Sequence, residues 1–265
     1  MQVVPAHAAD PQPLLNPHHE AARIIADELG IARALNTTNQ LAAQPPSGSL
    51  LDRVRVELAL HDAAYRYRVA ARDEEVRIYQ LAAYADFEKA TMALLPRSIA
   101  LPVQASINAL HSLYSLAGYD AYYLVNAHFD KPYGGVLTAS QLRSLYLEAQ
   151  RTYGVDWSYL ASINFVESDF GRVLGPSSAG AEGPMQFLPA TWASYGQGGD
   201  INNPHDAIVA AARYLVHYGA PGDMRRAIFH YNLDLDYVDS IVYFAQAFQN
   251  DPTWLDRMYY WGTTG

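Results

Sequence analysis

The sequence predicts an all-α protein, and three observations support this fold class. Apolar residues recur at spacings of three, four and seven along most of the chain, which is the period of an amphipathic helix. Residues that begin helices, such as Asn, Asp and Thr, precede these segments, and Gly ends several of them. A sustained alternation of apolar and polar residues, as a half-buried strand requires, does not occur in the sequence.

The composition excludes several classes of protein. The chain has 265 residues, of which 50% are hydrophobic and 17% charged, enough to bury the core of one large or two small domains. Cysteine is absent, which excludes disulfides, thiolate metal sites and a cysteine nucleophile. The formal net charge is −9 and the basic residues do not cluster, so no nucleic-acid partner is expected. No apolar run approaches the ~20 residues of a membrane-spanning helix, so no transmembrane segment is expected.

The first residues are interpreted as a tail. Residues 1–16 contain three prolines, which is typical of a flexible segment. Within them, Ala6-His7-Ala8 has the form of a signal-peptidase site, so the tail is equally interpreted as the remnant of a signal.

Long helices are predicted over residues 17–137. Asn16 and Pro17 begin a helix that extends to about residue 36, and a Pro- and Gly-rich linker follows at 44–49. From Ser49 to Leu95 there is neither Gly nor Pro, which predicts one very long helix or two broken helices. A further helix is predicted from Pro102 to Gly118.

The role of residues 17–137 has two interpretations. Tyr65, Tyr67, Tyr79 and Tyr84 can belong to an arm that binds a partner protein. The favoured interpretation is a helical scaffold that packs on the C-terminal part of the chain.

The C-terminal part, residues 138–265, has clearer helix signals. Each predicted helix begins after a capping residue or a proline and ends near a glycine or a polar loop. The predicted helices begin near Thr138, Asp156, Pro189, Asn203 and Asp223, and a last long helix contains Val238, Ile241, Val242, Ala245 and Phe248.

Glu167 is the first candidate for chemistry. Leu160, Ile163, Glu167 and Phe170 share one helix face, so this carboxyl lies in an apolar stripe. Its place in the last turn also sets its charge against the helix dipole. Both effects raise the pKa, as general-acid cleavage of a glycosidic bond requires. The alternative is a glutamate that turns outward or pairs with an arginine.

A second candidate is the segment from 177 to 192, which is rich in Gly and small residues and then becomes apolar. It can bring backbone amides and the side chain of Gln186 close to a ligand, or it can be an ordinary loop before a helix.

Four motifs in order resemble one known family. The chain resembles the lytic transglycosylases of the lysozyme-like superfamily, most of all the membrane-bound lytic transglycosylase B group and its exported actinobacterial relatives. The motifs are ESDFG at 167–171, AGAEGPMQF at 179–187 with Pro189 and Trp192, NPHDAI at 203–208, and YN at 231–232. They cover about residues 150–245, and the resemblance does not extend to residues 1–137.

The resemblance implies a fold, a reaction and a site. It implies that residues 138–265 form a lysozyme-like helical catalytic domain that cleaves the β-1,4 bond between N-acetylmuramic acid and N-acetylglucosamine in peptidoglycan. Glu167 matches the single catalytic acid/base, and the product is a 1,6-anhydro-muramoyl end. The matching substrate-binding positions are Ser168, Met185, Gln186, Phe187, Tyr195, Tyr231 and Asn232.

The resemblance also implies no cofactor, no metal ligand, glycan strands as the partner, and an exported protein. It implies a location in the periplasm, at the cell wall or outside the cell, because the substrate lies outside the membrane.

Two departures from the family are visible. The run after Tyr231-Asn232 is acidic where the family often has a glycine, and the loop at 197–200 is short beside those of the transglycosylase B group. They leave exo- or endo-action and the product distribution open.

Two other functions also remain open. A hydrolytic lysozyme needs a second carboxylate, for which Asp169, Glu182, Asp200 and Asp234 are available by type. A non-catalytic scaffold that only binds peptidoglycan is the other alternative.

Overall fold

A computed structural model describes residues 15–43, 49–118, 137–173 and 175–261. Within these residues the elements of regular structure are helices, and a short antiparallel bridge pairs Glu182 with Phe187. The all-α prediction is therefore confirmed. Residues 1–14 of the tail predicted at 1–16, and residues 44–48 of the linker predicted at 44–49, lie outside the described residues.

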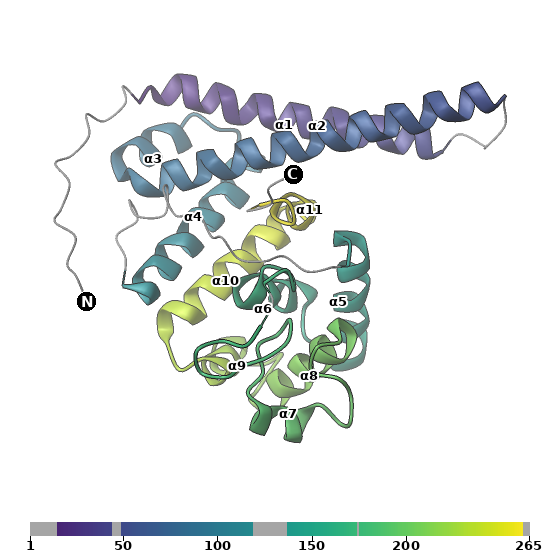
Figure 1. The fold of residues 1–265 in the computed structure, drawn as a ribbon. Helices are drawn as coiled ribbons and strands as arrows, with labels where there is room; N and C mark the ends of the chain where they lie inside the picture. The colour runs from purple at the N-terminus through teal and green to yellow at the C-terminus, as the bar shows by residue number, and fades with distance from the viewer. Residues whose placement is uncertain (1–14, 44–48, 119–136, 174, 262–265) are drawn as a thin grey trace.

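The first two helices form a long hairpin that lies along one side of the molecule (Figure 1). Helix α1 spans Pro17–Ala42, longer than predicted, and the Asn16 side chain caps it by accepting from the backbone N–H groups of His18 and His19. Helix α2 spans Leu50–Ala83, and Ser49 and Asp52 form a capping box at its start.

Two further helices complete the N-terminal half. Helix α3 spans Ala85–Met92, so the segment without Gly or Pro is broken at Tyr84 and the prediction of two helices is the correct one. Helix α4 spans Arg97–Ala117 and ends at Gly118, which has a φ of +68°. The prediction that Pro102 opens this helix was wrong, because the helix begins one turn earlier and Pro102 lies inside it.

The C-terminal half contains seven helices in its described residues. The five predicted helix starts are confirmed within one residue, because each depends on a local cap or proline. The five-residue α11 is too short for a periodic pattern and was not predicted. The helices are α5 Ala139–Tyr153, α6 Trp157–Ser168, α7 Pro189–Tyr195, α8 Pro204–His217, α9 Met224–Tyr231, α10 Leu235–Asn250 and α11 Trp254–Met258.

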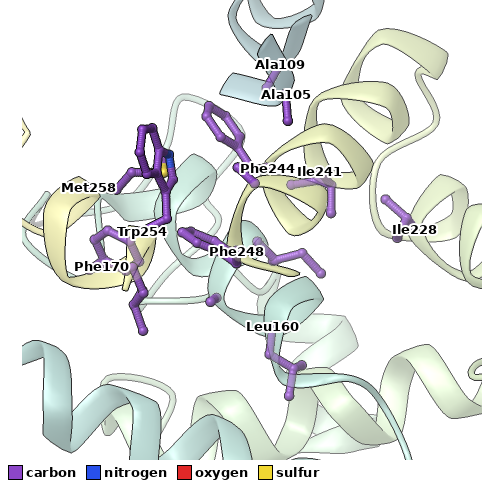
Figure 2. Close-up of a cluster of buried hydrophobic side chains, with 14 of the residues drawn as sticks. Ala105, Ala109, Leu160, Phe170, Ile228, Ile241, Phe244, Phe248, Trp254 and Met258 are labelled. Carbon is purple, nitrogen blue, oxygen red and sulfur yellow. The ribbon is translucent and has the colours of Figure 1, made fainter. Parts of the chain in front are cut away.

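Helix α10 lies at the centre of the molecule and packs on both α4 and α6. One continuous core joins Val103 and Ile107 of α4 to Phe244 and Phe248 of α10. Figure 2 shows this cluster, in which Phe170 and Trp254 lie near the aromatic side chains of α10. The core therefore crosses residue 138, and a domain boundary at that residue stays a prediction.

The hairpin is attached to the rest of the chain by buried charge. Arg257 of α11 is buried, and its guanidinium pairs with Glu28 of α1, with Glu74 of α2 at 3.2 Å, and with Asp251 at 3.0 Å. A second, smaller core of Ile31, Ala34, Tyr67 and Ala71 joins α1 to α2 farther along the hairpin.

None of the helices in the described ranges is both long enough and apolar enough to cross a bilayer.

Candidate functional site

The candidate acid, Glu167, lies in the last turn of α6. Asp156 caps this helix, and Leu160, Ile163 and Phe170 are buried on the face that carries Glu167. The Glu167 side chain is itself largely buried, and this burial raises the pKa of its carboxyl to about 7, from an ordinary value of 4.5. The direction predicted from the sequence is thus the direction found.

Tyr237 holds the Glu167 carboxyl in place. Its hydroxyl donates a hydrogen bond of 2.6 Å to Glu167 Oε1, and this bond opposes the rise in pKa because it stabilises the carboxylate. Tyr237 is buried in the first turn of α10, where Asp234 accepts the backbone N–H groups of Asp236 and Tyr237. Sequence reasoning missed this residue, because 70 positions separate the two partners and no local pattern joins them.

The chain reverses directly after Glu167. Asp169, Phe170 and Gly171 all have positive φ, at 49°, 59° and 81°. Ser168 Oγ accepts from the Gly171 backbone N–H at 2.9 Å and donates to the carbonyl of Pro184 at 2.6 Å. Ser168 is therefore buried, and its hydroxyl joins the end of α6 to the 182–187 loop.

A buried amide reinforces this attachment. Asn164 Nδ2 donates to the same Pro184 carbonyl at 2.7 Å, and Asn164 Oδ1 accepts from the Tyr146 hydroxyl at 2.6 Å. Asn164 and Ser168 of α6 thus hold the 182–187 loop directly, and Tyr146 of α5 fixes the orientation of the Asn164 amide.

The 182–187 loop is itself a tight turn. Glu182 and Phe187 exchange two backbone hydrogen bonds, of 2.9 and 3.0 Å. Gly183 has a φ of +73°, and a Cβ at this position would lie 1.9 Å from the carbonyl oxygen of Ile201, so only glycine fits. Gln186 also has a positive φ, of 47°, and its side-chain amide donates to the Gly183 carbonyl at 2.9 Å.

Tyr231 connects this loop to α9. Its hydroxyl donates to the Met185 carbonyl at 2.6 Å, while the Met185 side chain is buried in the core. Burial raises the pKa of Tyr231, and the charge of Glu167 adds to the effect, so the phenol lies near the carboxyl.

Aromatic rings extend from the loop toward α7 and α8. Phe187 contacts Tyr231 with ring centres 5.7 Å apart, and Tyr231 contacts Tyr214 at 5.3 Å. Tyr195 stands at the α7 end of this cluster, against Tyr214 at 5.0 Å. Asn232 is exposed just after α9.

The structure thus brings some of the predicted residues to the acid and leaves others apart. Tyr237 binds Glu167, and Tyr231, whose hydroxyl binds the Met185 carbonyl, lies near the same carboxyl. Ser168 and Phe187 are buried, and Tyr195 lies at the α7 end of the aromatic cluster.

The four carboxylates considered as the second carboxylate of a hydrolase bind other groups or lie in another part of the structure. Asp169 pairs with Arg172 at 3.5 Å, and burial raises its pKa to about 6. Asp200 accepts the Asn202 backbone N–H, and Asp234 caps α10. Glu182 lines a separate cavity of about 340 Å³ beside Phe170 and Pro184. None of the four is among the groups that shift the pKa of Glu167.

No group of three or more His, Asp or Glu side chains within the described ranges is arranged to hold a metal ion.

Comparisons with known proteins find similarity over the part of the chain that contains this site. The family model described as "Transglycosylase SLT domain" matches residues 144–238. A membrane-bound lytic murein transglycosylase F from Thiobacillus denitrificans is 32% identical over 124 residues, which are 43% of this chain and 26% of the relative. The chain therefore spans about a quarter of the length of this curated relative. No solved structure matches the chain.

The matched segment extends from α5 to the first turn of α10, and it contains Tyr146, Glu167, Tyr231 and Tyr237. Over residues 144–238, this chain is therefore similar to the transglycosylase SLT domain family.

Proposed function

We propose that this protein is a peptidoglycan lytic transglycosylase in which Glu167 is the single acid/base. The observation that carries the proposal is a largely buried carboxyl with a pKa of about 7, held by Tyr237 inside a transglycosylase SLT domain.

The reaction has two proton transfers through Glu167. First, the protonated carboxyl gives its proton to the oxygen between N-acetylmuramic acid and N-acetylglucosamine, and the bond from that oxygen to C1 of the muramoyl residue breaks. The muramoyl N-acetyl group assists at C1. Then the carboxylate takes the proton of the C6 hydroxyl, whose oxygen bonds to C1 and closes the 1,6-anhydro ring. Glu167 recovers its proton and no water is consumed.

A pKa near neutrality suits both steps. An acid with a pKa of about 7 is partly protonated at neutral pH, and its conjugate base is still strong enough to take a proton. Because Tyr237 occupies Oε1, the other carboxyl oxygen of Glu167 is the one offered to substrate.

The remaining site residues are assigned by their positions. The backbone of Met185 and Gln186, the Tyr231 ring and the exposed Asn232 are proposed to contact sugar. Ser168 is proposed to position the 182–187 loop, to which it is hydrogen-bonded. Phe187 and Tyr195 are proposed to support the site through the aromatic cluster to which they belong. We propose that the working protein lies outside the cytoplasmic membrane, because peptidoglycan lies there.

The test is digestion of purified peptidoglycan with separation and mass spectrometry of the products. Wild-type protein should release muropeptides with 1,6-anhydro-muramoyl ends. Glu167→Gln should lower the rate by about a hundredfold or more, because the amide cannot transfer a proton. Glu148→Gln, at an exposed carboxylate of α5, serves as the matched control and should keep the wild-type rate.

Two outcomes contradict the proposal. Products with reducing ends indicate a hydrolase and a water-positioning group. Retention of the protein on peptidoglycan without any product indicates a binding scaffold.

A further inference from the structure

Helix α2 carries apolar side chains on two opposite faces. Its buried face, which includes Ala63, Tyr67, Ala71 and Ile78, packs on α1 and the body of the molecule. Successive residues of an α-helix are rotated by ~100° about its axis. This rotation places a second set of apolar residues within an arc of about 40° on the opposite side of α2. We call this set the outer stripe: Leu51, Leu58, Tyr65, Val69 and Val76.

The outer stripe is exposed along its whole length. Its five side chains are between 40% and 69% accessible to solvent. Single exposed apolar residues are ordinary, but an aligned set of large ones marks a contact surface. The spacings of seven, seven, four and seven are those of a seam between paired helices, with one four-residue step that shifts the repeat.

We propose that the outer stripe binds a second copy of this chain, with the two α2 helices antiparallel about a two-fold axis. In one register the apolar residues meet in pairs. Leu51 faces Val76 of the partner subunit, and Leu58 faces Val69 of the partner subunit. Tyr65 lies beside the axis, and symmetry repeats every contact.

The charged residues beside the seam agree with this register. Arg55 meets Asp73 of the partner subunit, and Asp62 meets Arg66 of the partner subunit. On the other flank, Glu57 meets Arg72 of the partner subunit. All six side chains belong to exposed residues, and each contact joins opposite charges.

A parallel pairing fits less well. Arg72 lies on the same side of α2 as the outer stripe, so a parallel arrangement sets it against Arg72 of the partner subunit. The antiparallel register replaces this like-charge contact with a contact to Glu57, which favours the antiparallel form.

The size of the surface suits a dimer. The segment from Leu51 to Val76 is about 39 Å long, and with α1 alongside the face is about 20 Å wide, giving ~800 Å² per subunit. That is about the area that a stable pair of proteins buries on each partner. A shallow groove between the helices, of about 250 Å³ and lined by Ala26, Gly30, Tyr65 and Val69, extends the face toward α1.

The proposed interface does not compete with the candidate site. The hairpin lies on the opposite side of the molecule from α7, α8 and α9 (Figure 1). A dimer would therefore present two candidate sites, each able to reach a glycan strand.

Sedimentation velocity of the full chain, over about a hundredfold range of concentration, tests the proposal. Wild type should form a dimer, and Leu58→Glu should weaken it by about tenfold or more, because the charge is buried in the seam. The matched control is Leu235→Glu, since Leu235 and Leu58 are both 65% exposed. A wild type that stays monomeric, or a dimer that Leu58→Glu leaves intact, overturns the proposal. Circular dichroism checks that each variant is helical.

A charge exchange tests the register. Arg55→Asp alone and Asp73→Arg alone each create two like-charge contacts, so each variant should self-associate less. Mixed together, the two variants restore both contacts in a heterodimer and should associate as tightly as wild type. A mixture no tighter than the separate variants overturns the antiparallel register.

Discussion

At the scale of single residues, the Glu167 carboxyl is governed by two opposing effects. Burial favours its neutral form, while the Tyr237 hydroxyl favours its ionised form. The balance leaves the pKa at about 7, where one group can both give and take a proton. Tyr237 therefore holds the carboxyl in place and keeps its pKa from rising further.

Replacing Tyr237 should move the pH profile. Tyr237→Phe removes the hydrogen bond that lowers the pKa of Glu167, so this pKa should rise. The basic limb of the rate profile, which reports loss of the protonated acid, should move to higher pH, and kcat should fall. Tyr243→Phe, on the same helix, should leave the limb in place. A fall in rate with an unmoved limb would show that Tyr237 acts on packing alone.

The ionised form of Glu167 should also lower the free energy of unfolding. Its pKa is higher in the folded chain, at about 7, than the ordinary 4.5, so the folded state binds the proton more tightly. The free energy of unfolding therefore falls as pH rises from 4.5 through about 7. Glutamine does not ionise, so Glu167→Gln keeps this free energy of unfolding as the pH rises. The variant should be more stable than wild type by about 1–3 kcal/mol at pH values above the folded pKa.

Urea denaturation at a series of pH values checks this gain. It should be largest above the folded pKa and should vanish below about pH 4.5. An equal gain at every pH would show that the charge of Glu167 is not its source.

At the scale of elements, the 182–187 loop and the end of α6 form one unit. Asn164 and Ser168 both bind the Pro184 carbonyl, and Tyr231 binds the next carbonyl from the other side. Because three side chains from two helices fix two successive peptide groups, the loop is held in one conformation.

Gly183→Ala tests how closely the loop must fit. Its Cβ would meet the Ile201 carbonyl at 1.9 Å in a backbone conformation with φ of +73°, so stability should fall by about 2–4 kcal/mol. Gly180→Ala is the control, because Gly180 has a similar φ of +80° but no atom within 4 Å. It should cost about 1 kcal/mol. Chemical denaturation measures both losses of stability. Equal losses would show that the cost comes from the positive-φ backbone alone and not from the contact with Ile201.

At the scale of the whole molecule, a few buried contacts hold the hairpin of α1 and α2 to the C-terminal half. Arg257 is buried with Glu28 and Glu74, and its guanidinium also lies over the Trp254 ring at 4.6 Å. Burial raises the pKa of Glu74 well above its ordinary range. One cation therefore joins α1, α2 and α11.

Removing this cation should be costly. Arg257→Met leaves buried carboxyls without their partner and should lower the free energy of unfolding by about 3–5 kcal/mol. Arg225→Met removes an exposed partner of Asp239 and should cost less than about 1 kcal/mol. Thermal and urea denaturation measure both. A small effect at Arg257 would mean that apolar packing, not charge, attaches the hairpin.

The sequence alone determined the helical class and most helix starts. Thr138, Asp156, Asn203 and Asp223 each cap a helix through contacts within four residues, so a local pattern predicts them. It also placed Glu167 on a buried face, because helical spacing alone sets that face.

The tertiary structure decided what lies against these elements. Tyr237 reaches Glu167 across 70 positions, and Arg257 reaches Glu28 across 229. It also decided that Ser168 is buried under a loop and that Pro102 lies inside a helix. The physical reason is range: caps and spacings act within a turn or two of helix, whereas a partner, a burial or a pKa depends on segments that only packing brings together.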